Sequence, residues 1–512
     1  MRITQGLSRA ADVRPHHLAV VDGERKKSWT EFRDRVARLA GALQGLGVQR
    51  GDRIAVLANN SDRYLECYYA IFWIAAVLVP LNTRLAVAEL EYQLADAGVT
   101  LFLFGAEFET HVAKLRAKLD FRSVALDGPS PSADKTYEDL MARAAPVPET
   151  EGPDNELAAI FYTGGTTGVA KGVMHTHKSL SAMATNLVMS LQVDEDSVAL
   201  HSAPMFHMAD IAVWTMTQVA GTHVITPRFD EDAMFDLIAR HSVSHIFTVP
   251  TVIDRLARHP RAATANVSSL KMLGYGGAPM PPAVLENARE RFRNIAFGQG
   301  FGMTEMPAIS YLSPKWHRKG ANPEKLKSAG AAAYGYQLKV VNEADEELPR
   351  GEIGEIVGRG DNLMAGYWNR PEATAEALRG GWMHSQDVGF MDEDGAIYIT
   401  DRLKDMIVSG GENVYSIEVE NVVYRHEAVL ECAVVGVPDE RWGERVHAIV
   451  HPKSGMSVTI DELSAFCRDK IAGYKIPRSL QIHETPLPRS GAGKILKTDL
   501  RAPHWAGRDR KI

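Results

Sequence analysis

The sequence predicts an α/β protein: a large N-terminal domain of stacked α/β sheets plus a β-rich subdomain, and a small mobile α+β C-terminal domain. Short apolar runs alternate with amphipathic helical patterns up to Arg350, which is typical of parallel sheets covered on both faces. Gly-rich turns and alternating strand patterns follow Arg350. A chain of 512 residues is also too long for one hydrophobic core. We place the domains at 1–402 and 403–512.

The individual elements are expected from apolar periodicity. A helix should begin near Thr30, its predicted N-cap, and end before Gly47. The remaining expected elements are strands at 54–57, 100–104, 123–126, 157–161 and 245–249, helices at 111–119 and 233–239, and a buried helix within 67–79. Residues 127–154 are interpreted as a surface connection.

The second half is expected to contain more antiparallel structure. Strands are predicted at 351–358, 395–399, 433–437 and 446–450. Between Ile460 and Ile471 we expect a helix, and Thr459 and Glu462 have the spacing of a capping box at its start.

Composition excludes several classes of protein. The net charge of −7 argues against nucleic acid as a partner. Cys67, Cys432 and Cys467 lack metal-site or disulfide spacing, which favours a reducing cytoplasm. We expect neither a signal peptide nor a membrane span, because the apolar run 67–79 is too short to cross a bilayer. A homodimer is left open.

The segment Tyr162–Gly172 is the strongest local signal. It follows an apolar strand pattern and supplies four glycines, three threonines and Lys171. Glycines allow close backbone approach, while amides, hydroxyls and the ammonium group donate to phosphate. The segment lacks the Gly-Lys-Ser/Thr of a Walker A loop. It therefore predicts phosphate binding, with a flexible surface turn as the alternative.

Taken with further motifs, this loop resembles the AMP-binding signature of the adenylate-forming superfamily, acyl-CoA synthetase type. The matching motifs, in family order, are Met205-Phe206-His207, Gly276-Gly277-Ala278-Pro279, Gly300-Phe301-Gly302-Met303-Thr304-Glu305, Gly381–Asp387, Asp401–Asp405, Ser409–Asn413 and Gly493–Lys497. The match covers nearly the whole chain. It implies an enzyme that joins a carboxylate to ATP, giving acyl-AMP and pyrophosphate, after which the thiol of coenzyme A displaces AMP.

The resemblance implies a site for ATP and Mg²⁺. It assigns the β- and γ-phosphates to Thr163, Gly164, Gly165, Thr166, Thr167, Gly168 and Lys171. Mg²⁺ is assigned to Glu305 with Thr163 beside it, and the α-phosphate to Thr304. The base and ribose are assigned to Gly276, Gly277, Ala278, Gln299, Gly300, Phe301 and Asp387. From residue type alone, Phe301 would be expected in the core.

Lys494 is the strongest catalytic candidate. Glu305, Thr304 and His207 are the other catalytic candidates. The resemblance implies that the Lys494 ammonium group neutralises the carboxylate and the α-phosphate as they meet. Arg402 and Lys404 match the family hinge, about which the small domain exchanges Lys494 for Ser409, Gly410, Gly411 and Glu412.

Coenzyme A is implied as the thiol by Trp442, Tyr474, Lys475 and Arg478, which suit its nucleotide end. We also expect no carrier domain after Ile512. An acyl-AMP ligase that loads a carrier protein remains an alternative. The glycines at 298–302 suggest a dinucleotide-binding oxidoreductase, but they do not have the G-x-G-x-x-G spacing that such an enzyme requires. A catalytically dead nucleotide-binding module conflicts with the presence of Lys494 and Glu305.

The carboxylic acid is assigned by resemblance to a pocket of mostly small or apolar residues: His207, Ala209, Ile211, Val213, Tyr275, Gly300, Gly302, Met303, Pro307 and Ala308. A pocket without a fixed counter-charge disfavours amino acids. We expect a fatty acid, with an aryl acid of the ferulate or coumarate type as the alternative. His207 is either a wall of this pocket or a core histidine.

The chain departs from the family pattern at Gly164, where Ser is usual, at Ala170, where Pro is usual, and at Gln386, where a small residue is usual. Losing one hydroxyl removes at most one phosphate hydrogen bond, about 1 kcal/mol net. We therefore expect activity with altered nucleotide affinity.

Overall fold

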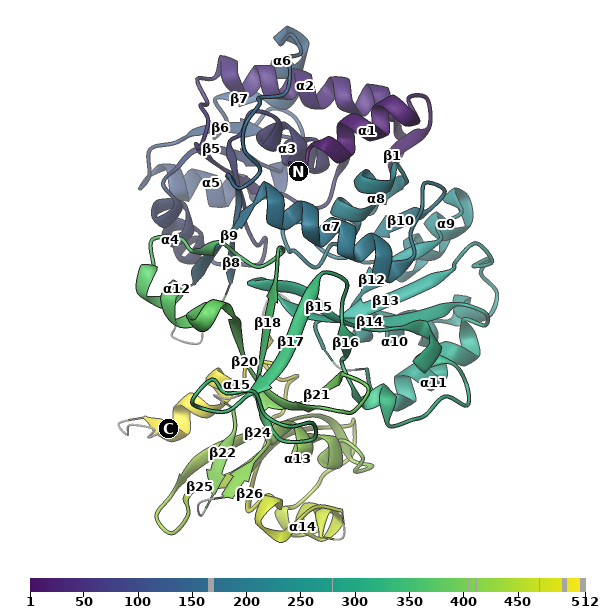
Figure 1. Ribbon diagram of the computed structural model, residues 1–512, viewed down its shortest axis with the longest axis vertical. Helices are drawn as coiled ribbons and strands as arrows, with labels where there is room; N and C mark the ends of the chain where they lie inside the picture. The colour runs from purple at the N-terminus through teal and green to yellow at the C-terminus, as the bar shows by residue number, and fades with distance from the viewer. Residues whose placement is uncertain are drawn as a thin grey trace. The chain divides into compact units, whose positions relative to one another are not determined.

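The computed structural model describes residues 1–163, 170–278, 280–402, 405–409, 412–468, 470–489 and 495–506 (Figure 1). The chain divides into two compact units. Unit 1 contains Met1–Leu338 and Gly358–Met383, and unit 2 contains Lys339–Val357 and His384–Ile512. The chain therefore crosses between the units more than once.

One sheet of unit 1 has eight strands in the order β19-β9-β8-β4-β3-β5-β6-β7. Its strands β3 to β8 pair in parallel, whereas β9 runs antiparallel to both β8 and β19. In chain order the strands are β3 (Arg53–Leu57), β4 (Val77–Pro80), β5 (Val99–Phe104), β6 (Arg122–Ala125), β7 (Lys135–Thr136), β8 (Leu157–Thr163), β9 (Lys171–Thr176) and β19 (Gly366–Tyr367).

The second sheet of unit 1 has the order β16-β15-β14-β13-β12-β10-β11-β1-β2 within this unit. Strands β14, β13, β12, β10, β11 and β1 are parallel, and the hairpin β14–β15 is antiparallel. The strands are β1 (Leu18–Asp22), β2 (Arg25–Ser28), β10 (Val198–His201), β11 (Thr222–Ile225), β12 (His245–Thr248), β13 (Met272–Gly276), β14 (Ala296–Met303), β15 (Met306–Leu312) and β16 (Gly330–Ala332).

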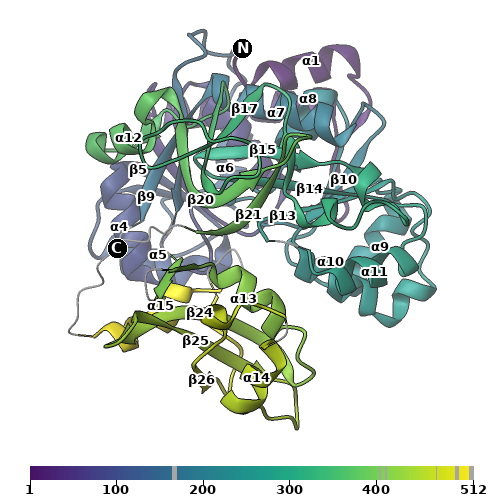
Figure 2. The same cartoon turned by 60° about the horizontal axis from the view of Figure 1, so that its bottom comes forward.

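Helices cover both sheets, as three hydrophobic clusters show. The largest cluster lies between the sheets and draws on α1 (Gln5–Val13), α2 (Trp29–Gly45), α3 (Asp62–Trp73), α7 (His177–Leu191) and α8 (Ala212–Val219). A second cluster packs α9 (Glu231–His241), α10 (Pro250–Arg258) and α11 (Pro282–Arg291) on the other face of the second sheet (Figures 1 and 2). A third packs α4 (Val87–Ala97) and α5 (Glu109–Arg116) on the outer face of the first sheet. Unit 1 also contains α6 (Tyr137–Arg143) and α12 (Pro371–Ala377).

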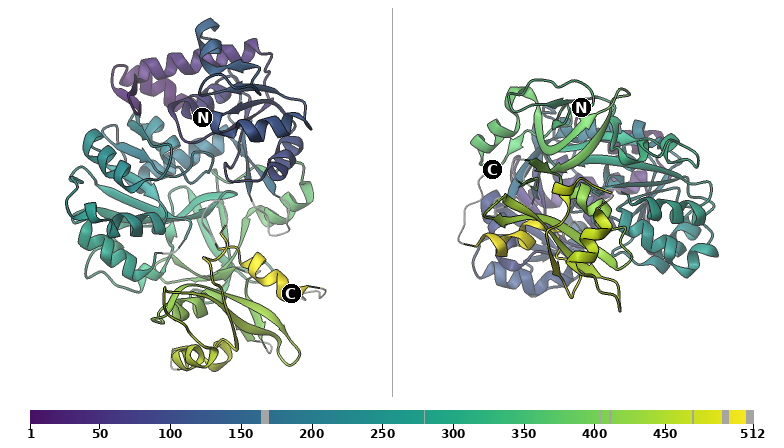
Figure 3. Two further views of the ribbon diagram at one scale, coloured as in Figure 1. Left: turned by 180° about the vertical axis from the view of Figure 1, so that it is seen from behind. Right: turned by 90° about the horizontal axis from the view of Figure 1, so that it is seen from below.

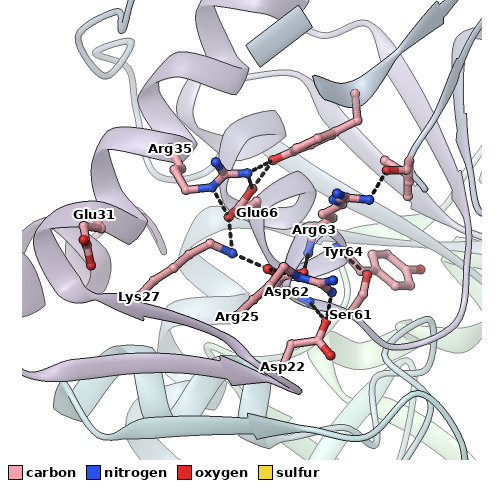
Figure 4. Close-up of polar contacts among 12 residues, drawn as sticks. Asp22, Arg25, Lys27, Glu31, Arg35, Ser61, Asp62, Arg63, Tyr64 and Glu66 are labelled. Atoms are coloured by element: carbon pink, nitrogen blue, oxygen red, sulfur yellow. Dashed lines mark hydrogen bonds and ion pairs between the residues drawn. The ribbon is translucent and has the colours of Figure 1, made fainter. Parts of the chain in front are cut away.

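A buried ionic network fixes the start of α3 (Figure 4). Asp62 accepts hydrogen bonds from Arg25, and an ion pair joins it to Lys27. Glu66, one turn later, accepts from Arg35 Nε at 2.7 Å and from the Tyr137 hydroxyl. Burial alone would raise the pKa of Asp62, but Arg25 and Lys27 outweigh it and lower that pKa below its usual range. The Asp62 carboxylate therefore stays ionised and ties the start of α3 to the β1–β2 hairpin.

Unit 2 is a smaller α+β body with its own core (yellow-green in Figure 3). It includes β20 (Met383–Met391), β21 (Ala396–Arg402), β22 (Ile407–Ser409), β23 (Glu412–Val414), α13 (Ser416–Val423), β24 (Val429–Asp439), β25 (Gly443–Pro452), α14 (Ile460–Cys467), β26 (Ser479–Ile482) and α15 (Lys497–Arg501). The chain passes between the units within β17 (Tyr336–Val341), within β18 (Gly354–Gly360) and after the first residue of β20. The hairpin β24–β25 pairs antiparallel over Val429–Pro452.

Most expected elements are confirmed, and three details are wrong. The N-cap of α2 is Ser28 rather than Thr30, because Ser28 and Glu31 form a capping box. The run 67–79 is not one helix, since α3 begins at Asp62 and Val77 starts β4. Residues 127–154 contain β7 and α6, and Tyr137 is buried there. The capping box at Thr459 and Glu462 is confirmed.

Candidate functional site

Residues of β9, of β19 and of the turn between β14 and β15 come together around Glu305 in unit 1. Thr163 and Lys171 are opposite each other in the β8–β9 pair, at the two ends of the glycine-rich loop. The Lys171 ammonium nitrogen lies 4.9 Å from the centre of the Tyr367 ring, and the Tyr367 hydroxyl donates to Glu305 Oε1 at 2.9 Å. Gly164–Gly168 lie outside the described residues.

Backbone contacts fix the turn that carries Thr304 and Glu305. The amide of Met364 donates to the Glu305 carbonyl at 2.9 Å. His175 Nε2 lies 2.8 Å from the Thr304 carbonyl oxygen. Burial lowers the pKa of His175 to about 4, so the ring is neutral at pH 7 and Nε2–H is the donor. The turn is thus held from β9 and from the segment before β19.

Burial and the Glu305 charge raise the pKa of the Tyr367 phenol, so the hydroxyl keeps its proton and donates to the carboxylate. The Lys171 ammonium group thus contacts the Tyr367 ring, and the hydroxyl of the same ring donates to the Glu305 carboxylate. Tyr367 and His175 were missed by the sequence analysis. Gly366-Tyr367 is an aromatic-glycine signal, but nothing in its spacing points to Glu305.

Four glycines lie on one face of the paired strands β13 and β14. Gly274 is opposite Gly298, and Gly276 is opposite Gly300, so the four share one face. A Cβ at Gly274 would collide with Phe247 at 2.5 Å, and one at Gly298 with the Tyr311 hydroxyl at 2.4 Å. At Gly300 a Cβ would meet nothing within 4 Å. Space therefore opens beside Gly300, with two aromatic rings along the same face.

The other residues assigned to the nucleotide lie around this edge. Gly277 has a φ of +74°, which favours glycine, and Ala278 is exposed. Gln299 is buried. Phe301 is half-buried against the cluster that includes Val173 and Met306, which fits the core interpretation as well as the adenine one.

The residues assigned to the acid divide into loop and core positions. His207 is half-buried and its Nδ1 accepts from the Ala209 amide at 3.0 Å. Ala209 is exposed and Ile211 half-buried, whereas Val213 and Tyr275 are buried in hydrophobic clusters. The Tyr275 hydroxyl is 2.8 Å from His317 Nε2.

Gly302, Met303, Pro307 and Ala308 form the β14–β15 hairpin. A Cβ at Gly302 would lie 2.5 Å from the Ala308 amide nitrogen, so the hairpin requires glycine there. Ala308 has a φ of +50°, an uncommon conformation for alanine, and lies next to the register shift of this hairpin. The backbone at this position is strained.

In unit 2, Asp387 is buried on β20 and pairs in register with Arg402 of β21. Its neighbour Gln386 has a φ of +60° and donates its amide to Glu355. This departure from the family pattern therefore occupies a backbone position that favours a residue without a branched side chain. Ser409 is buried opposite Glu412 in the β22–β23 hairpin.

Four assigned residues of unit 2, Lys404, Gly410, Gly411 and Lys494, lie outside the described residues. Arg489 and Ile495, which flank the segment containing Lys494, form an antiparallel bridge. The residues assigned to coenzyme A form two groups. The guanidinium carbon atoms of Arg441 and Arg478 lie 4.7 Å and 5.0 Å from the Trp442 ring centre. Lys475 is ion-paired with Glu418 and lies over Tyr474.

Comparison with known proteins identifies the family. The family model described as "AMP-binding enzyme" matches residues 7–368, and "AMP-binding enzyme C-terminal domain" matches residues 418–494. The chain belongs to the AMP-binding enzyme family. The expected superfamily, its fold class and the enzymatic nature of the chain are thereby confirmed.

Individual relatives cover almost the whole chain. A feruloyl-CoA synthase of Amycolatopsis is 41% identical over 496 residues, covering 96% of this chain and 97% of the relative. A long-chain-fatty-acid–CoA ligase of Mycobacterium tuberculosis is 35% identical over 506 residues, covering 98% of each chain. The solved structure of the amide bond synthetase McbA from Marinactinospora thermotolerans is 30% identical, with a TM-score of 0.88 over 98% of this chain and 99% of that one.

Within the AMP-binding family the chain is an ATP-dependent, AMP-forming acid–CoA ligase that uses ATP, Mg²⁺ and coenzyme A. The donor set around Glu305 fits Mg²⁺, which is usually held by one or two carboxylates together with substrate phosphates. Among the described residues no group of three or more His, Cys, Asp or Glu could form an all-protein metal cage. Within the same residues no helix is long and apolar enough to cross a membrane.

Proposed function

We propose that this enzyme activates an uncharged carboxylic acid with a planar aryl tail and transfers it to coenzyme A. The observation that carries this proposal is the glycine face of β13 and β14, with open space at Gly300 and the rings of Phe247 and Tyr311 on the same face. Aromatic walls favour a flat ring, which can stack or approach them edge-on. The 41% identity to a feruloyl-CoA synthase supports the same choice.

A fatty acid, our expectation from the sequence, is the second candidate. It is supported by the apolar lining at Ile211 and Met303 and by the 35% identity to a long-chain-fatty-acid–CoA ligase. Both candidates are uncharged beyond the carboxylate, so both agree with a pocket that lacks a fixed counter-charge.

The proposed chemistry has two steps. In the first, a carboxylate oxygen attacks the α-phosphorus of ATP, the bond to the pyrophosphate oxygen breaks, and acyl-AMP forms. In the second, the thiol sulfur of coenzyme A attacks the acyl carbon, the proton leaves the sulfur, and AMP departs with the bonding electron pair. Mg²⁺ would neutralise phosphate charge in the first step.

We assign the residues of this chain as follows. Glu305 and Thr163 hold Mg²⁺, Lys171 and its loop hold the β- and γ-phosphates, and Thr304 holds the α-phosphate. Asp387 accepts from the ribose hydroxyls, and Lys494 offsets the charge of the two approaching anions. Lys404 and Arg402 mark the hinge between domains 1–402 and 403–512.

Two further assignments belong to this proposal. We place the enzyme in the cytoplasm, supported by three buried free thiols at Cys67, Cys432 and Cys467. A homodimer stays a prediction, to be checked by light scattering.

The test is a panel of acids assayed for AMP release with and without coenzyme A. The panel contains hydroxycinnamates, a fatty-acid series of increasing length, and an amino acid as the charged control. We expect AMP and acyl-CoA from a hydroxycinnamate at the highest kcat/KM. A preference for long fatty acids selects the second candidate. Turnover of the amino acid alone, or acylation of carrier protein in place of coenzyme A, contradicts the proposal.

A further inference from the structure

Two imidazoles, a hydroxyl and a carboxylate form a continuous buried network beside residues 202–211 of unit 1, the loop that carries residues assigned to the carboxylic acid. His201 is the last residue of β10, and His223 lies on the neighbouring strand β11. His201 Nδ1 is 2.7 Å from Asp210 Oδ2, and His201 Nε2 is 2.9 Å from His223 Nδ1. His223 Nε2 is 3.0 Å from the Thr217 hydroxyl on α8.

All four residues of this hydrogen-bonded network are buried. The relative exposure is 0% for His201, 2% for Asp210 and 1% for Thr217. A buried carboxylate is costly unless it is paired, so His201 is what allows an aspartate at position 210. Conversely, removing either partner leaves an uncompensated polar group in the core.

Asp210 lies in the loop that carries residues assigned to the acid. This loop, residues 202–211, connects β10 to α8, and Asp210 is flanked by Ala209 and Ile211. The Asp210 amide also donates to the His207 carbonyl at 3.0 Å. The Asp210 side chain therefore ties the second half of the loop to the end of the strand from which the loop departs.

The first half of the loop has separate anchors. Asn60 Oδ1 accepts from the Met205 amide at 2.7 Å, and Asn60 Nδ2 donates to the Ala203 carbonyl at 2.8 Å. The Tyr68 hydroxyl donates to the Met205 carbonyl at 2.5 Å. These contacts reach Met205. Beyond it, Phe206 and Met208 are buried in the largest hydrophobic cluster, and the His207 amide donates to the Pro204 carbonyl at 3.0 Å. The pair His201–Asp210 adds a link from this part of the loop back to β10.

We propose that His201 and Asp210 are positioning residues that set the conformation of the 206–211 loop and thereby the fit of the carboxylic acid. The proposal rests on the assignment of His207, Ala209 and Ile211 to the acid under the proposed function. Neither side chain is expected to touch substrate, because both are buried and bonded to each other. Their effect is exerted on the acid and not on ATP.

The experiment measures KM for the acid, KM for ATP and kcat for three variants of the full-length enzyme. Asp210→Ala should raise KM for the acid by about tenfold or more, the loss expected for a charged hydrogen bond, and leave KM for ATP within about twofold. Asp210→Asn keeps an oxygen opposite His201 and should restore most of the affinity for the acid. His201→Gln keeps an amide group opposite His223, which can donate or accept, but loses the bond to Asp210, so it should match Asp210→Ala.

Ser123→Ala is the matched control, since it also removes a buried hydrogen bond of unit 1, from Ser123 Oγ to the Ser132 carbonyl at 2.6 Å. It should lower the melting temperature without changing KM for the acid. If Asp210→Ala and His201→Gln behave like this control, or if KM for ATP rises with KM for the acid, the positioning role is wrong. If Asp210→Ala does not fold, the same criteria apply to His201→Gln. An unmodified enzyme that releases no AMP with any acid would overturn the proposed function and the positioning role with it.

Discussion

Replacing Tyr367 by phenylalanine removes one hydroxyl from the centre of the proposed ATP site. That hydroxyl donates to Glu305 Oε1 at 2.9 Å, and Tyr367 and Glu305 are 8% and 7% exposed. A hydrogen bond to a charged acceptor contributes about 1.5–3 kcal/mol, which corresponds to roughly 10- to 150-fold in an equilibrium constant. The phenyl ring remains beneath the Lys171 ammonium group, so the change acts mainly on Glu305.

The assay is pyrophosphate release at a saturating acid concentration with varied Mg·ATP. We expect Tyr367→Phe to raise the Mg·ATP concentration at half-maximal rate by about tenfold, because Glu305 loses a hydrogen-bond donor that helps to orient it. Calorimetric titration of Mg·ATP into the resting enzyme should show the same loss of affinity without any turnover.

Tyr137→Phe is the matched control, because its hydroxyl also donates to a buried glutamate, Glu66, in the ionic network of α3. It should reduce stability and leave Mg·ATP binding unchanged. Equal effects of the two substitutions on Mg·ATP, or no effect of Tyr367→Phe, would refute the role given to Tyr367.

Three further predictions concern the glycine face, acid stability and Lys494. Gly300→Ala should leave the melting temperature unchanged, because its Cβ meets nothing within 4 Å, yet raise KM for the acid or ATP; unaltered kinetics would show that no substrate occupies that space. Burial lowers the pKa of His175 and His317 to about 4, so between the unfolded value near 6.5 and about 4 the unfolded chain binds protons that the folded chain does not. Each histidine should therefore cost about 3 kcal/mol of unfolding free energy as the pH falls through that window, and urea titrations that are flat from pH 7 to 4.5 would contradict this. Lys494→Ala should nearly abolish adenylate formation and leave CoA transfer from preformed acyl-AMP largely intact; equal loss in both half-reactions would exclude the assigned role.

The fold was predictable where periodicity is strong and local. The apolar runs that became β5, β8 and β12 have no competing interpretation, and the Thr459–Glu462 box has a fixed spacing. The start of α2 was misplaced by two residues because Ser28 and Thr30 are both good N-caps, and only the Glu31 side chain decides between them. Helix α6 was missed because its flanks are rich in Pro, Ser and Asp, while its burial depends on contacts between Tyr137 and the distant Glu66.

The candidate site shows the same division. Glu305, Thr163 and Lys171 are site candidates because they belong to motifs whose residues are neighbours in sequence. Tyr367 and His175 were not, because their importance comes from strand pairing that brings β19 to β9 and places β9 against the 304–305 turn. The pair His201–Asp210 was missed for a related reason, since the two residues are nine apart and meet through the shape of a loop.

The central claim is tested most directly by incubating the enzyme with ATP, Mg²⁺, coenzyme A and a hydroxycinnamate, and identifying the products by mass spectrometry. We predict AMP, pyrophosphate and the hydroxycinnamoyl-CoA thioester in equal amounts, and only acyl-AMP and pyrophosphate, in equal amounts, when coenzyme A is omitted. Formation of ADP, or of acyl-AMP that coenzyme A does not consume, would contradict this prediction.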